Sequence, residues 1–148
     1  MRTGADVVRD VLAALAPAEL PFLESVLEAY RIDPWTLDGR RAGVPADQVR
    51  AWSAFVLGFV AETVVAQQPA GEPGRGRLRM MLTRRRSRIG ELANVPDAPV
   101  PAFEAEQLRR AWASAVGAAA GRGHPPRDTE AFAVAVVAAL AARRPPAD

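Results

Sequence analysis

The chain contains no cysteine and no lysine, and its single histidine is His124. The absence of cysteine excludes disulfides, thiolate nucleophiles, iron–sulfur clusters and cysteine-based zinc sites. One histidine cannot form a typical zinc site alone, and a lone histidine in a loop such as GRGHPP is usually solvated. We therefore expect no metal, no cofactor and no assigned catalytic residue, although helical enzymes can work with Asp, Glu and Arg alone.

Motifs for covalent catalysis and nucleotide binding are also missing. The chain has four serines, at positions 25, 53, 87 and 114, and none lies in a Gly-x-Ser-x-Gly elbow. The segment GEPGRGR at 71–77 is rich in glycine, but it lacks the Gly-Lys-Ser/Thr ending of a phosphate-binding loop and follows no strand. The absence of these motifs argues against an enzyme but does not exclude one.

The basic residues are all arginine and are unevenly distributed. Exclusive use of arginine, together with 31 alanines, favours a GC-rich bacterial source. Seven of the 19 arginines fall within 75–88, where there is no acidic residue, and the remainder of the chain carries a net charge of −5. A chain polarised in this way can bind an anion or pair with itself.

Alternating strand patterns are absent, and apolar residues recur at helical spacing throughout the 148 residues. Thr3 followed by Asp6 resembles a capping box, and Asp128 suits a helix N-cap. We predict an all-α, single-domain bundle of five to seven helices over 1–148, with a Pro/Gly-rich linker at 69–76 and a short disordered tail at 145–148. The expected helices span 4–16, 18–31, 46–68, 77–94 and 102–120, and a last one begins near residue 128.

Two of these helices are apolar on every side. Glu62 is the only charge between Ala51 and Gln68, so the third helix, about 46–68, should lie in the centre of the bundle. The last helix is apolar all round from Ala131 to Ala142, so it either fills the centre beside the third helix or keeps one side free for a partner. This supply of apolar surface predicts a homo-oligomer or a protein partner.

No apolar stretch reaches the roughly 20 residues that a bilayer span needs. The first residues, MRTGADVVRD, are charged and amphipathic and contain no apolar signal core. We therefore expect no membrane span and a cytoplasmic protein.

The arginine run itself has two interpretations. On a helical wheel Arg85 falls inside the apolar stripe of the fourth helix, which suggests a buried pair between Glu62 and Arg85. The other arginines fall on the flanks and back, where they could either be solvated or bind a polyanion such as nucleic acid. The candidate polyanion-binding residues are Arg75, Arg77, Arg79, Arg84, Arg86 and Arg88.

Two segments resemble parts of helix-turn-helix proteins. In Arg40–Trp52, Gly43 and Val44 match the turn of such a unit, but Asp38 stands where an apolar anchor belongs. The segment Arg88–Pro99 resembles the opening of such a unit, but VPDAPVP cannot supply the second helix in register.

Three functions remain in view. The leading one is a non-catalytic α-helical protein-interaction or accessory protein that self-associates. The alternatives are a nucleic-acid-binding or regulatory protein that uses the arginine-rich helix 75–88 on phosphates, and a small helical enzyme or ligand-binding bundle with a polar site at Glu62 and Arg85. An apolar cavity that reaches Glu62 would favour the last of these.

Overall fold

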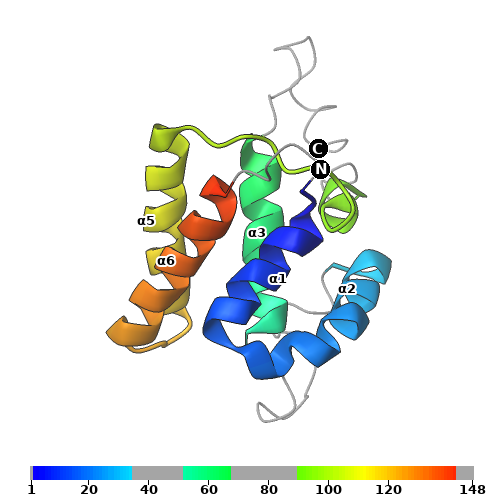
Figure 1. Cartoon of the computed structure of the whole chain (residues 1–148), viewed down its shortest axis with the longest axis horizontal. Coiled ribbons are helices and arrows are strands. Elements are labelled where there is room, and N and C mark those ends of the chain that lie inside the picture. The colour runs from blue at the N-terminus through cyan, green and yellow to red at the C-terminus, as the bar shows by residue number, and fades with distance from the viewer. Residues whose placement is uncertain (1, 35–51, 68–89, 143–148) are drawn as a thin grey trace, which may run out of the picture.

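The computed structural model describes residues 2–34, 52–67 and 90–142, and these form an all-α bundle (Figure 1). Within these ranges the only β-type contact is an isolated bridge between Thr3 and Pro99. Residues 90–94 are helical as well. The named elements are α1 (Gly4–Leu15), the 3-10 helix η1 (Pro17–Phe22), α2 (Leu23–Ile32), α3 (Ser53–Gln67), α5 (Ala105–Gly121) and α6 (Pro126–Ala141).

The N-terminal helix α1 begins at the capping box expected from the sequence. The Thr3 hydroxyl accepts a hydrogen bond from the Asp6 N–H, and the Asp6 carboxylate accepts one from the Thr3 N–H at 2.9 Å. The apolar face of α1 is fully buried because the helix packs against both α3 and α6. That face consists of Val7, Val8, Val11 and Leu12.

The segment 95–100 is fastened to the start of α1 by main-chain hydrogen bonds. The Ala5 N–H donates to the Pro96 carbonyl at 3.0 Å, and the Val100 N–H donates to the Arg2 carbonyl at 2.9 Å. Gly4 allows this approach, since a Cβ there would lie 2.3 Å from the Val95 carbonyl oxygen. The chain therefore turns after residue 94 and forms no second helix of a helix-turn-helix unit at 95–100.

The prediction of an α-helix over 18–31 is wrong for the first part of that range. Residues 17–22 form the 3-10 helix η1, and α-helical geometry begins only at Leu23. Pro21 explains the difference, because it has no N–H to donate and its ring crowds the preceding turn. Glu19 is half-buried, and its carboxylate accepts hydrogen bonds from the Ser53 N–H at 3.1 Å and from the Ser53 hydroxyl at 2.7 Å. It therefore caps the start of α3 from another element.

The helix α3 is the central, all-round apolar helix that the sequence predicts. It contacts α1, α2 and α5, and within Ser53–Gln67 only Glu62 and Ala66 are exposed. The predicted first turns of this helix, before Trp52, lie outside the described residues. So do the linker 69–76, the tail 145–148 and the whole arginine run 75–88.

The helices α5 and α6 form a closely packed hairpin (Figure 1). Three alanines four residues apart, Ala111, Ala115 and Ala119, are buried on α5 and permit a short distance between the helices. α5 begins three residues later than predicted, behind a capping box made by Glu104 and Gln107. α6 begins at Pro126, so Asp128 lies in its first turn and is not the N-cap. None of the described helices is long and apolar enough to cross a bilayer.

Candidate functional site

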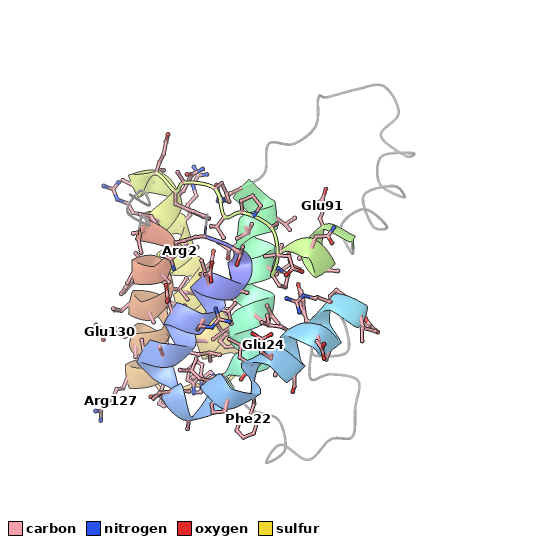
Figure 2. All side chains as sticks on the ribbon, turned by 45° about the vertical axis from the view of Figure 1, so that its right-hand side comes forward. Arg2, Phe22, Glu24, Glu91, Arg127 and Glu130 are labelled. Carbon is pink, nitrogen blue, oxygen red and sulfur yellow. The ribbon has the colours of Figure 1, made fainter. Side chains whose placement is uncertain are left out.

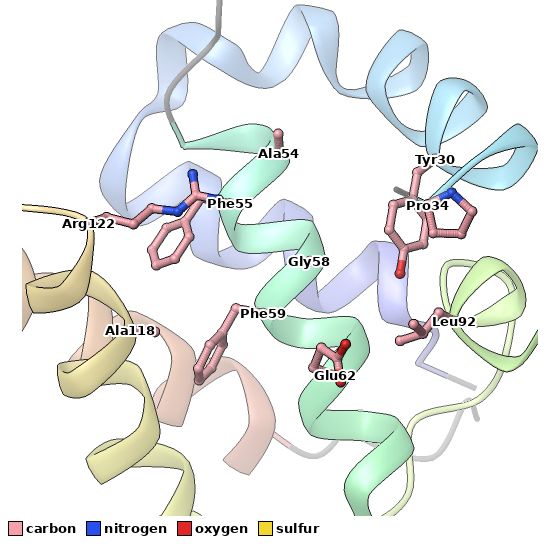
Figure 3. Close-up of a pocket in the computed structure, with 10 residues that line it drawn as sticks. All are labelled: Tyr30, Pro34, Ala54, Phe55, Gly58, Phe59, Glu62, Leu92, Ala118 and Arg122. Atoms are coloured by element: carbon pink, nitrogen blue, oxygen red, sulfur yellow. The ribbon is translucent and has the colours of Figure 1, made fainter. Parts of the chain in front are cut away.

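An open groove of about 250 Å³ runs along α3 on the side that α1 leaves uncovered (Figure 3). α2 and the helical residues 90–94 supply one wall, and α5 supplies the other. The described residues that line it are Tyr30, Pro34, Ala54, Phe55, Gly58, Phe59, Glu62, Leu92, Ala118 and Arg122.

The floor of the groove is a row of α3 residues spaced by four. Ala54, Gly58 and Glu62 recur at i, i+4 and i+8, so they share one face over two helical turns. A Cβ built at Gly58 would meet no described atom within 4 Å. Packing among the described residues therefore does not require glycine here, although glycine costs a helix interior roughly 0.5–1 kcal/mol relative to alanine.

The wall beside α5 is aromatic. Phe55 and Phe59 both pack against the buried Phe132 of α6, with ring centroids 4.8 and 5.3 Å apart. The Arg122 guanidinium lies over the outer face of Phe55, 4.8 Å from the ring centroid, in a cation–π contact. This wall is apolar, and it carries a positive charge at the end of the groove near the start of α3.

The opposite wall is apolar except for the hydroxyl of Tyr30. Tyr30 is 3% exposed and lies across the groove from Glu62 (Figure 3). Burial raises the pKa of the Tyr30 hydroxyl above its ordinary value, and the negative charge of Glu62 raises it further. Tyr30 is therefore a neutral hydroxyl at physiological pH. The groove consequently has an acidic end at Glu62, a basic end at Arg122 and an apolar middle.

His124 is not the solvated loop residue that the sequence suggested. Its ring stacks on Trp52 with centroids 4.4 Å apart and an interplanar angle of 17°. Trp52 in turn contacts Phe55 and Phe132, so the loop after α5 is anchored to the aromatic wall of the groove. This contact was missed because it joins residues 72 positions apart, which no local pattern reveals.

A second cavity, of about 260 Å³, lies between the N-terminal residues and the end of α6. Arg2 lines it, donates to the Ala142 carbonyl at 3.0 Å and pairs with Asp10. These contacts tie the first residues to the last turn of α6, which is a structural role.

The predicted site residues are only partly placed. Glu62 lines the groove, as the ligand-binding alternative required. Its predicted partner Arg85 and the candidate polyanion residues at 75, 77, 79, 84, 86 and 88 lie outside the described residues. Gly58, Tyr30 and Arg122 were not identified from the sequence. A glycine in the middle of an apolar helix was the local signal that could have identified Gly58.

The described part of the chain contains no candidate metal site. There, no group of three or more His, Asp or Glu side chains is arranged to hold a metal ion. Comparisons with protein families, with curated proteins and with solved structures find no match to this chain. The groove is therefore interpreted from its own geometry.

Proposed function

We propose that this protein is a non-catalytic interaction protein that binds a helical segment of a partner in the groove along α3. The observation that carries the proposal is Gly58, which keeps the floor of the groove open at a cost to helix stability. A missing side chain on one helix lets the backbone of a second helix approach closely. An amphipathic helix laid into an apolar groove is a recurrent mode of recognition.

The size of the groove favours a segment of protein over a small molecule. Its volume of about 250 Å³ is below the roughly 300–1,000 Å³ of pockets that enclose whole ligands. An open groove of this size accommodates one or two side chains of a helix whose remainder stays outside. The enzyme alternative needs reacting groups beyond Glu62, Tyr30 and Arg122, and the described lining of the groove contains no others.

Charge indicates which helix would bind. The described residues contain 7 arginines and 13 acidic residues, whereas the whole chain has a formal net charge of +2, so only the local charge of the groove bears on the choice of helix. Glu62 brings one of these acids to an apolar surface, beside the Tyr30 hydroxyl. The chemistry of the groove therefore favours a helix with an apolar stripe that contains one basic side chain.

The test uses a model helix of alanine and leucine with one arginine in its apolar stripe, and a twin with glutamine at that position. Gly58→Leu should weaken binding of the arginine helix at least about tenfold, because the leucine occupies the floor. Gly117→Leu is the matched control, since Gly117 lies on the exposed side of α5 with no described atom within 4 Å of a built Cβ. Equal effects of the two substitutions, or equal binding of the twins, would contradict the proposal.

The polyanion alternative rests on the seven arginines between 75 and 88 and remains a second proposal. Binding to a short random-sequence duplex should then weaken with salt, with a slope of log K against log salt of about −4 to −6 for five to seven contacts. Changing Arg84, Arg86 and Arg88 to Gln should flatten the slope. Absence of binding at low salt would leave the groove as the candidate site.

A further inference from the structure

The hairpin of α5 and α6 is fastened to both ends of α3. At the end of α3, the Gln107 side-chain amide donates to the Gln67 side-chain oxygen at 2.7 Å. At the start of α3, the turn of residues 122–124 contacts two aromatic rings. The outer side of α6 adds no support, because Arg127 and Glu130 are exposed and point away from the bundle (Figure 2). Since α5 itself packs mainly against α6, its distance from α3 along the groove depends on these two fastenings as well as on α6.

A glycine turn ends α5 and sets the direction of the chain after it. Gly123 has a φ of 83°, in the left-handed region that other residues rarely adopt. The Gly123 N–H donates to the Ala120 carbonyl at 3.0 Å, and the His124 N–H donates to the Ala119 carbonyl at 3.2 Å. These two hydrogen bonds form the Schellman ending of a helix. The main chain of the 122–124 turn is therefore fixed independently of the side chains that it carries.

The residues on either side of Gly123 reach two rings at the start of α3. The Arg122 guanidinium lies 4.8 Å from the centroid of the Phe55 ring (Figure 3). The His124 ring stacks on Trp52, and its centroid lies 5.9 Å from that of Phe55. The buried Phe55 ring is thus contacted by the turn from two sides. Phe55 lines the groove, whereas His124 does not.

We infer that the 122–124 turn positions Phe55 and thereby sets the width of the groove near the start of α3. His124 is then a positioning residue, because it acts on the bound helix through the Trp52 and Phe55 rings and does not touch the helix itself. This inference rests on the proposed function and adds what determines how well the partner helix fits. A wall that is already in its bound shape saves the free energy of ordering it, so a Phe55 ring that can change its rotamer should lower the affinity.

Binding of the fluorescently labelled arginine model helix to the full chain, followed by anisotropy, tests this role. His124→Ala should weaken binding at least about fivefold. His124→Phe keeps a flat ring on Trp52 and should bind within about twofold of the wild type. Arg2→Ala is the control for a general loss of stability, because it removes contacts at the second cavity and changes nothing that lines the groove. It should leave binding unchanged.

A double-mutant cycle tests whether His124 acts through Phe55. Phe55→Leu removes the ring that the turn holds and should itself weaken binding, since Phe55 lines the groove. In that background His124→Ala should change binding by less than about twofold, because no ring remains there for it to position.

A pair of glycine variants provides a second route should His124→Ala impair folding, because it leaves every ring in place. Gly123→Val should weaken binding at least about threefold, since a branched side chain is strained at positive φ and shifts the turn. Gly121→Val, two residues earlier and still in α5, is the matched control and should have a smaller effect. A Cβ built at either glycine meets no described atom within 4 Å, so the two variants differ in backbone strain.

Wild-type affinity in His124→Ala would overturn the inference and leave the proposed function intact. The same holds for a loss that persists in the Phe55→Leu background, or for a loss of equal size in Arg2→Ala. Absence of binding of the model helix to the wild-type chain would remove the proposed function and the positioning role together.

Discussion

α3 and α6 have the same kind of sequence and very different surroundings. Both are apolar on every side, yet α3 exposes only Glu62 and Ala66, whereas α6 exposes a whole stripe. The difference lies in their neighbours, because α3 is contacted by α1, α2 and α5 and by Phe132 of α6, whereas α6 is held by α1, α5 and α3 on its inner side only. Hydropathy identifies the helices that require partners, and the topology decides how many partners each one receives within the chain.

The strongest test of this comparison places the same charge at two valines. Val60 on α3 is fully buried, so Val60→Asp should lower the free energy of unfolding by more than about 4 kcal/mol through an unpaired buried charge. Val134→Asp on α6 should change it by less than about 0.5 kcal/mol, because the carboxylate stays in water.

Urea unfolding followed by circular dichroism measures both variants. Similar losses at the two positions would mean that the outer side of α6 is covered in the isolated chain.

The N-termini of α3 and α6 allow a second comparison, of how each helix is capped. The N-terminus of α3 is capped by Glu19 from η1, whereas α6 begins at Pro126 with no side-chain cap. Glu19→Ala should therefore cost about 0.5–2 kcal/mol of stability, in the range of a lost N-cap.

Asp128→Ala on α6 is the control and should cost only the weaker helix-dipole interaction, about 0.3–1 kcal/mol. Thermal unfolding ranks the two variants, and a larger loss for Asp128→Ala would contradict the assigned cap.

Replacing a helical glycine by alanine should have a smaller effect on the free energy of unfolding, and this effect should be an increase. Gly58→Ala should stabilise the protein by about 0.5–1 kcal/mol, since alanine is the better helix former and no described atom lies within 4 Å of its Cβ. Gly117→Ala on α5 should give a similar gain.

These gains are measurable as increases in the midpoint of chemical unfolding. A loss of stability in Gly58→Ala alone would show that the floor of the groove is already filled in the folded chain.

The last test is the alkaline titration of the groove, whose effect is confined to pH values above about 10. The pKa of Tyr30 is raised in the fold above the value of about 10 expected in the unfolded chain. The unfolded state therefore loses its proton first as the pH rises above about 10, so the stability contributed by the buried hydroxyl is present below that pH and is lost above it.

Tyrosinate absorbance follows this titration directly, because Tyr30 is the only tyrosine and the chain has no lysine or cysteine to titrate nearby. Tyr30→Phe should make the loss of stability above pH 10 less steep. Ionisation of Tyr30 at the same pH in folded and urea-unfolded chain would contradict its burial.

Much of the fold was predictable because it follows from local periodicity. The capping box at Thr3 and Asp6, the buried face of α1 and the central position of α3 are all set by residues within two or three turns of one another. The 3-10 geometry at Pro21 was missed although its cause is local, because a proline within the first turn of a helix is usually tolerated.

The candidate site was predictable only through Glu62. Its groove depends on which faces of α2, α3 and α5 meet, and that is a tertiary property. The capping of α3 by Glu19 and the stacking of His124 on Trp52 depend on the same long-range packing. The lone acid in an apolar helix indicated where the site lies on α3, but it could not predict the shape of the groove.

The position of α1 has a consequence for how the protein is made. α1 is synthesised before α6, but its valine face is completed by α6, and the Arg2 side chain donates to the Ala142 carbonyl. On the ribosome that face remains without its final neighbour until α6 has emerged, so the bundle closes late and by long-range contacts. Until then the valines of α1 are exposed in the nascent chain.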